Sequence, residues 1–169
     1  MPLVPKVTLV VIAHNIRSSH NIGSLFRTAE ALGASKLYLT GFTPYPKSVH
    51  DTRLPHVATK THKDIAKTAL GAEHLLKWQQ TSDITQLIKR LKRRNYKIVA
   101  LEQAPNSVDL RDCALLGRVA LVLGNEPSGI DAETLRLCDI AVEIPMKGDK
   151  ESLNVVQAAA IAMYHFGYL

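Results

Sequence analysis

The chain has 169 residues, of which 46% are hydrophobic, and it carries a formal net charge of +6 with a pI near 9.4. This composition excludes an intrinsically disordered protein, and a chain of this length can bury one substantial core without disulfides or a structural metal. The positive charge favours an anionic partner, without choosing among RNA, DNA and lipid. Cys113 and Cys138 lack the spacing of metal ligands, which indicates reduced, mostly buried thiols in a cytoplasmic protein.

The opening segment, residues 1–13, is predicted to end in the first strand of the fold. Pro2 and Pro5 precede its apolar run and His14 follows it, which is not the pattern of a signal peptide. No apolar stretch approaches the roughly 20 residues that a membrane-spanning helix needs. We therefore expect no membrane partner.

Apolar runs alternate with amphipathic segments along the rest of the chain. The predicted strands are residues 7–13, 36–41, 75–79, 97–102, 119–124 and 140–144, and the predicted helices are 22–32, 64–71, 83–95, 131–138 and 153–166. Helix 83–95 has the clearest apolar stripe, and Ser82 is its expected cap. Continuous apolar strands between helices predict a three-layer α/β domain with a mainly parallel sheet.

The longest irregular piece is residues 42–62, which contain Pro44, Pro46 and Pro55 and several basic residues. A loop of that length in a compact domain is expected to be functional.

Three segments stand out because each follows a predicted strand, where open parallel sheets bind ligands. In the first, residues 15–27, Gly23 and Arg27 lie one helical turn apart, so a guanidinium would stand above a backbone patch that could hold a phosphate or ribose. The alternative is that Asn21 caps the helix and Arg27 is solvated.

The second segment, residues 121–131, sets the carboxylate of Glu126 between Gly124 and Gly129. Its alternative interpretation is a tight turn into a helix that Asp131 caps. The chain has neither the glycine fingerprint of dinucleotide-binding folds nor a phosphate-binding loop with its lysine.

The third segment, residues 144–160, is a polar loop that leads into a helix of small residues. Ser152 is a natural helix cap, so a loop, a cap and a buried helix explain everything except the polar Asn154 two positions later.

In this order, the three segments resemble the three motifs of the TrmH (SpoU) family of the SPOUT superfamily, which are RNA 2′-O-ribose methyltransferases. The resemblance covers nearly the whole chain, and the third motif, I-P-M-x-G-x-x-x-S-L-N, is its most specific part. It implies a single α/β domain over residues 1–169 with a C-terminal deep trefoil knot at about 97–169, a rare exception to unknotted folds. It also implies a homodimer, an RNA substrate, either tRNA or rRNA, and S-adenosylmethionine as cofactor.

The resemblance assigns roles to particular residues. The catalytic set would be Arg27, Asn21, Glu126, Ser152 and Asn154, and the cofactor-binding set would be Leu101, Gly124, Ile144, Met146 and Leu153. Arg27 would be the general base or, because arginine holds its proton so firmly, a clamp on the RNA phosphate. Basic residues that could follow the RNA backbone are Arg17, His20, Arg53 and Lys60. The histidines near these residues are spread over loops without the spacing of a zinc site, so no metal is expected in the protein.

Two alternatives from other classes stay open. One is a SPOUT-fold RNA-binding or assembly protein that has lost catalysis, against which stands the presence of every polar residue expected of an active member. The other is a small-molecule enzyme on an ordinary doubly wound sheet, which the missing glycine fingerprint disfavours.

Overall fold

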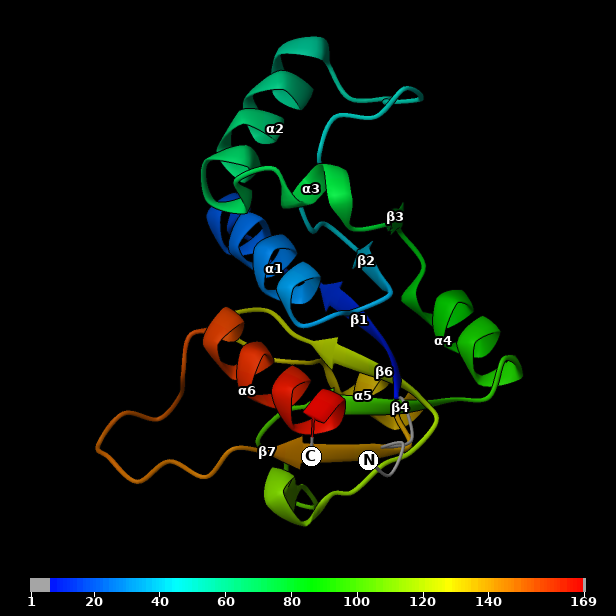
Figure 1. Cartoon of the computed structure of the whole chain (residues 1–169), viewed down its shortest axis with the longest axis vertical. Coiled ribbons are helices and arrows are strands. Elements are labelled where there is room, and N and C mark those ends of the chain that lie inside the picture. Colours follow the sequence, from blue (N-terminus) through cyan, green and yellow to red (C-terminus); the bar gives the residue numbers. More distant parts are fainter. Residues whose placement is uncertain (1–6, 169) are drawn as a thin grey trace, which may run out of the picture.

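A seven-stranded, wholly parallel sheet forms the centre of the protein in a computed structural model that describes residues 7–168 (Figure 1). Its strand order is β3-β2-β1-β6-β4-β7-β5. The strands are β1 Thr8–His14, β2 Lys36–Thr40, β3 Trp78–Thr81, β4 Tyr96–Leu101, β5 Val108–Asp109, β6 Arg118–Leu123 and β7 Ile140–Glu143. Residues 1–6 of the opening segment, and Leu169, lie outside the described residues.

Helices cover both faces of this sheet. They are α1 Ser19–Ala31, α2 Pro55–Ala69, α3 Ala72–Leu75, α4 Ile84–Arg93, α5 Ala132–Leu137 and α6 Val155–Tyr168, with a short 3-10 helix at Leu110–Asp112. The three-layer, parallel α/β fold predicted from the sequence is thereby confirmed.

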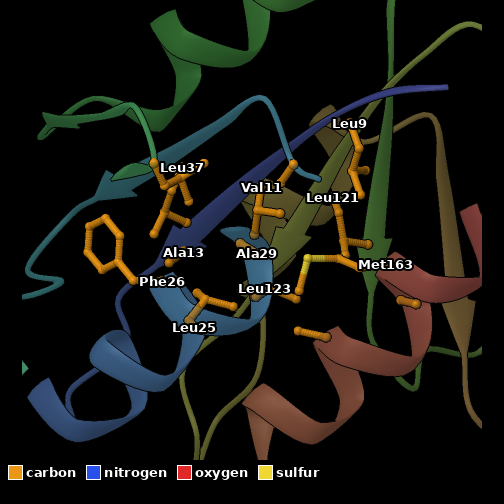
Figure 2. Close-up of a cluster of buried hydrophobic side chains, with 14 of the residues drawn as sticks. Leu9, Val11, Ala13, Leu25, Phe26, Ala29, Leu37, Leu121, Leu123 and Met163 are labelled. Atoms are coloured by element: carbon orange, nitrogen blue, oxygen red, sulfur yellow. The ribbon is translucent and has the colours of Figure 1, made fainter. Parts of the chain in front are cut away.

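Alternate residues of each central strand enter two separate cores. In β1, Leu9, Val11 and Ala13 point into the core under α1 and α6, and Val10 and Ile12 point into the core under α4 and α5. Figure 2 shows the first core, in which side chains of β1, β2 and β6 meet those of α1 and Met163 of α6. Burial on both faces explains why these strands are continuous apolar runs.

The carboxyl ends of β1, β4, β6 and β7 open towards one edge of the sheet, because all the strands are parallel. The segment after β7 is long, and it leads the chain to α6, which packs beside α1 (Figure 1). The three segments singled out in the sequence all start from this edge.

Several predicted boundaries were wrong. Helix α2 starts at Pro55 and not at residue 64, so only residues 42–54 of the predicted loop 42–62 are irregular; proline suits the first position of a helix. Residue 75 belongs to α3, and the third strand begins at Trp78. Asp83, not Ser82, caps α4, since its carboxylate accepts the N–H of Gln86 at 2.9 Å.

Both cysteines are free thiols, Cys113 buried and Cys138 partly buried. Across residues 7–168, no helix combines the length and apolar character needed to cross a bilayer.

Candidate active site

A cleft of about 580 Å³ opens at the carboxyl edge of the sheet, between the segments that follow β4, β6 and β7 and the start of α6. The size falls in the range of about 300–1,000 Å³ typical of small-molecule sites. All five residues predicted to bind a cofactor line it: Leu101, Gly124, Ile144, Met146 and Leu153. Three predicted catalytic residues also line it: Glu126, Ser152 and Asn154.

One chain of side-chain hydrogen bonds joins the three sequence segments at the mouth of this cleft. The amide of Asn154 donates to Oδ1 of Asn21 at 3.3 Å, and the amide of Asn21 donates to Oε1 of Glu126 at 3.0 Å. These residues are 133 and 105 positions apart in sequence. The fold therefore brings together the polar groups that the three segments supply.

Glu126 lies at the amino end of α1. Its carboxylate accepts the backbone N–H of Arg17 at 3.0 Å and of Ser18 at 3.3 Å, so an anion meets the positive end of the helix dipole. Partial burial would raise the pKa of Glu126, but the hydrogen bonds from Arg17, Asn21 and Ser18 outweigh burial and lower it. The side chain is an anion at neutral pH.

The lining of the cleft is acidic although the chain as a whole is basic. Four glutamates line it, Glu102, Glu126, Glu143 and Glu151, and none of the described lining residues is lysine, arginine or histidine. Its remaining walls are apolar side chains and uncharged polar groups. Such a cleft favours a ligand with positive charge and disfavours phosphates inside it.

The two glycines of the second segment close a tight loop. A Cβ on Gly124 would lie 2.5 Å from the carbonyl carbon of Gly129, and Gly129 has a φ of +71°. The carboxylate of Glu102 packs against Gly129 and accepts the N–H of Ile130 at 2.8 Å. Sequence reasoning missed Glu102, although a carboxylate directly after an apolar strand is a usable signal.

Asn154 caps the start of α6, a role predicted for Ser152. Its Oδ1 accepts the N–H of Val156 at 2.9 Å and its carbonyl accepts the N–H of Ala158 at 3.0 Å. The side chain thus caps the helix through its oxygen and holds Asn21 through its nitrogen. Ser152 stays exposed in the cleft lining.

Asn21 does not cap α1, because Ser18 does: its hydroxyl accepts the N–H of Asn21. The amide of Asn21 is free to face Glu126.

The interpretation of Gly23 as a bare ligand patch was wrong. A Cβ there would clash with Thr68 and with the backbone carbonyl of Ile65, so the absent side chain lets α1 and α2 pack closely. Arg27, on the same helix face, is exposed and lines a shallow hollow between these two helices, outside the cleft. Within residues 7–168 its guanidinium makes no hydrogen bond or ion pair.

The predicted RNA-contacting residues differ in their exposure and in the contacts that their side chains already make. Arg17 and His20 are exposed beside the cleft mouth, at the start of α1. Lys60 is exposed and pairs with Asp64 at 2.8 Å. Arg53 is held inside its own loop by Asp51, by two backbone carbonyls and by the ring of Tyr45, so its guanidinium has a structural role.

The parallel sheet has a ligand-sized cleft at its carboxyl edge, walled by loops from three strands, and this places the protein among the α/β proteins that bind a small ligand at that edge. The family model described as the SpoU rRNA Methylase family matches residues 8–164, and the chain belongs to this family.

Similar proteins span a range of RNA targets. The chain is 30% identical to a tRNA (guanosine(18)-2'-O)-methyltransferase of Borreliella burgdorferi and 31% identical to the 23S rRNA (guanosine-2'-O-)-methyltransferase RlmB of Xylella fastidiosa, each over 92% of this chain. It spans 64% and 57% of these relatives' lengths. The crystal structure of the SpoU methyltransferase AviRb from Streptomyces viridochromogenes in complex with the cofactor AdoMet matches with a TM-score of 0.78 and 25% identity, over 96% of this chain and 57% of that one.

Proposed function

We propose that the protein is an RNA methyltransferase that uses S-adenosylmethionine to methylate a ribose 2′-hydroxyl of tRNA or rRNA. The observation that carries this proposal is the hydrogen-bonded set Asn154, Asn21 and Glu126 at the mouth of an acidic cleft. Family membership and the names of the relatives support the same reaction.

The cleft lining fits the proposed cofactor. A sulfonium and an amino group carry positive charge, which the four glutamates favour, and the apolar walls supplied by Leu101, Ile144 and Leu153 suit an adenosine and a thioether chain. When bound, S-adenosylmethionine supplies a methyl carbon that its sulfonium charge makes electrophilic. The protein must then mainly align an acceptor oxygen with that carbon.

Asn21 and Asn154 are the side chains proposed to orient the ribose. Their amides have further donor and acceptor capacity beyond the bonds between them, and both lie where the cleft opens to solvent. Glu126 fixes Asn21 in place, and the exposed hydroxyl of Ser152 offers another hydrogen bond. When the ribose oxygen is held in place, less entropy is lost in aligning it with the methyl carbon of the cofactor.

Arg27 is proposed to clamp the RNA phosphate rather than to act as the base. Arg27 is exposed and stands outside the cleft, and its planar guanidinium matches the geometry of a phosphate. The 2′-hydroxyl would lose its proton to the clamped phosphate or to water as the carbon–oxygen bond forms. Arg17, His20 and Lys60 are proposed as further backbone contacts; Arg53 is left out because its loop already uses it.

We also propose that the protein works as a homodimer in the cytoplasm. One exposed stripe of α6 presents Ile161, Tyr164 and Tyr168, and the two tyrosine rings stack with centroids 4.9 Å apart. A stripe of exposed aromatic residues suits an interface between subunits. The two free cysteines suit a reducing compartment.

The proposed knot lies in residues 97–169 of a single SPOUT domain. In its support, β6 inserts between β1 and β4, and the ring of His165 in α6 lies 2.8 Å from the carbonyl of Cys113 in the connection that precedes β6. Stretching single molecules by their ends tests it. A knotted chain stops short of the contour length of about 3.3–3.6 Å per residue, and an unknotted chain reaches it.

Calorimetric titration with S-adenosylmethionine, followed by methyl transfer to total tRNA and to rRNA, tests the proposed function. We expect one site per chain, no binding of ATP, and methyl groups on ribose in one of the RNAs. Asn21→Ala should reduce methyl transfer at least tenfold while cofactor binding stays within about threefold. A chain that binds RNA and no cofactor would be an inactive scaffold, and the proposal would be wrong.

A further inference from the structure

We propose that His62, Glu73 and His74 form a zinc-binding site that joins α2 to α3, apart from the cleft. Zinc is bound in proteins by imidazole nitrogens and carboxylate oxygens, and two histidines with one glutamate are an established ligand set. One ligand atom from each of these three residues lies within 4.8 Å of the others. None of the three lines the cleft.

The fold brings these residues together through a sharp turn. Helix α2 carries His62 and ends at Ala69; its C-cap, Leu70, has a φ of +51°, and Gly71 follows with a φ of +94°. The chain then turns back into α3, which carries Glu73 and His74 (Figure 1). Sequence spacing alone does not predict a metal site here, because the ligands come from two helices whose relative placement depends on this turn.

The state of Glu73 points to a missing partner. Its side chain is only 3% exposed, and its Oε2 is buried without any hydrogen-bond partner among the described residues. A buried carboxylate oxygen without a partner is costly, so a native fold that keeps one calls for a cation or a proton donor at that position. Both imidazoles lie within 4.8 Å of its carboxylate, and imidazole nitrogens are zinc ligands.

The present geometry is close to that of a bound ion. Two ligands at 2.0–2.1 Å from a tetrahedral zinc lie about 3.3 Å apart. Oε1 of Glu73 is 3.4 Å from Nε2 of His74, and the imidazole rings of His62 and His74 have centroids 6.0 Å apart. His74 is exposed and His62 partly so, which lets both rings rotate onto an ion and leaves room for a water as fourth ligand.

One existing contact reports on the site. The backbone N–H of Lys47 donates to Nδ1 of His62 at 3.3 Å, a long hydrogen bond. Zinc binding through Nδ1 replaces this bond. Zinc binding through Nε2 moves the ring proton to Nδ1, which can then no longer accept the N–H of Lys47. The amide signal of Lys47 in an NMR spectrum should therefore move when zinc is added.

Titration of the chelator-treated full chain with zinc chloride, under reducing conditions, tests the site. We expect one zinc per chain, and affinity at least tenfold lower in each of His62→Gln, Glu73→Gln and His74→Gln. The matched control is His50→Gln, an exposed histidine of the preceding loop, which should bind as the wild type does. Cobalt in place of zinc should give the visible absorption bands of a tetrahedral nitrogen and oxygen site.

Glu73→Gln also separates ligand loss from misfolding. Without metal, this variant should melt at the wild-type temperature or above it, because a neutral amide replaces a buried carboxylate whose Oε2 has no hydrogen-bond partner. A lower melting temperature would mean that the carboxylate already has its partner, and the proposal would be overturned. It would equally be overturned if the wild type bound no zinc, or if all three variants bound it as tightly as the control.

Discussion

Replacing Gly23 by alanine should change the stability of the protein in opposite directions, depending on whether this face of α1 meets a ligand or packs against α2. If the bare backbone at residue 23 faced a ligand, the variant would fold more stably by roughly 0.8–1 kcal/mol, since alanine is the better helix former. In the structure the position faces α2, where a Cβ would approach the carbonyl of Ile65 and the hydroxyl of Thr68 closer than 3 Å. Helix α2 would have to retreat by about 1 Å, an overpacking that costs about 1–3 kcal/mol.

A hydrogen bond adds to this cost. The hydroxyl of Thr68 donates to the carbonyl of His20 at 2.7 Å, and rotating it away from the new methyl group loses about 1 kcal/mol. With the gain in helix propensity subtracted, Gly23→Ala should lower the free energy of unfolding by about 1–3 kcal/mol.

Urea unfolding followed by circular dichroism, at one fixed protein concentration, measures the change. Gly167→Ala in α6 is the control, because the nearest atom to its Cβ is 4.0 Å away and its stability should stay within about 1 kcal/mol of the wild type. A Gly23→Ala protein that is at least as stable as the wild type but inactive would refute the packing explanation and restore the ligand interpretation.

Three further predictions use other parts of the chain. Glu126→Gln keeps the shape of the side chain but removes the charge at the start of α1, so methyl transfer should fall at least tenfold and the free energy of unfolding by about 1 kcal/mol, as measured by tritium transfer and urea titration. Burial raises the pKa of Cys138 to about 11, so at pH 8 iodoacetamide should label it about a hundredfold more slowly in the folded chain than in urea; equal rates would contradict its burial. Hydrogen bonds from Lys60 and Lys67 lower the pKa of Asp64 to about 2 from a usual 3.8, so its contribution to stability is present above pH 4 and lost between about pH 4 and 2; Asp64→Asn should flatten the acid melting curve in that window.

The sheet could be predicted from the sequence because its central strands are buried on both faces. Apolar residues at consecutive positions, as in residues 119–123, favour a strand between two layers of helices. The first half of helix α2 was missed because few of its residues are buried and apolar. Its buried face consists of Ala58, Ile65 and Ala69 only, which gives a weak periodic signal behind a proline-rich loop.

The sequence indicates which residues lie near the cleft, but it does not indicate which of them contact one another. Helical geometry places Gly23 and Arg27 on one face, yet nothing in the local sequence says that α2 covers that face. Similarly, the spacing of Ser152 and Asn154 does not reveal which of them caps α6, since both residue types serve as caps. Contacts between segments more than 100 positions apart depend on the complete fold, and these are the contacts that hold Asn21 beside Glu126 and Asn154.

Mass spectrometry of RNA from cells with and without the gene tests the central claim most directly. Removing the gene should abolish one 2′-O-methylated nucleotide in tRNA or rRNA, and the wild-type gene, but not one encoding Asn21→Ala, should restore it. A complete set of ribose methylations in RNA from the cells that lack the gene, or the loss of a base methylation instead, would contradict the account.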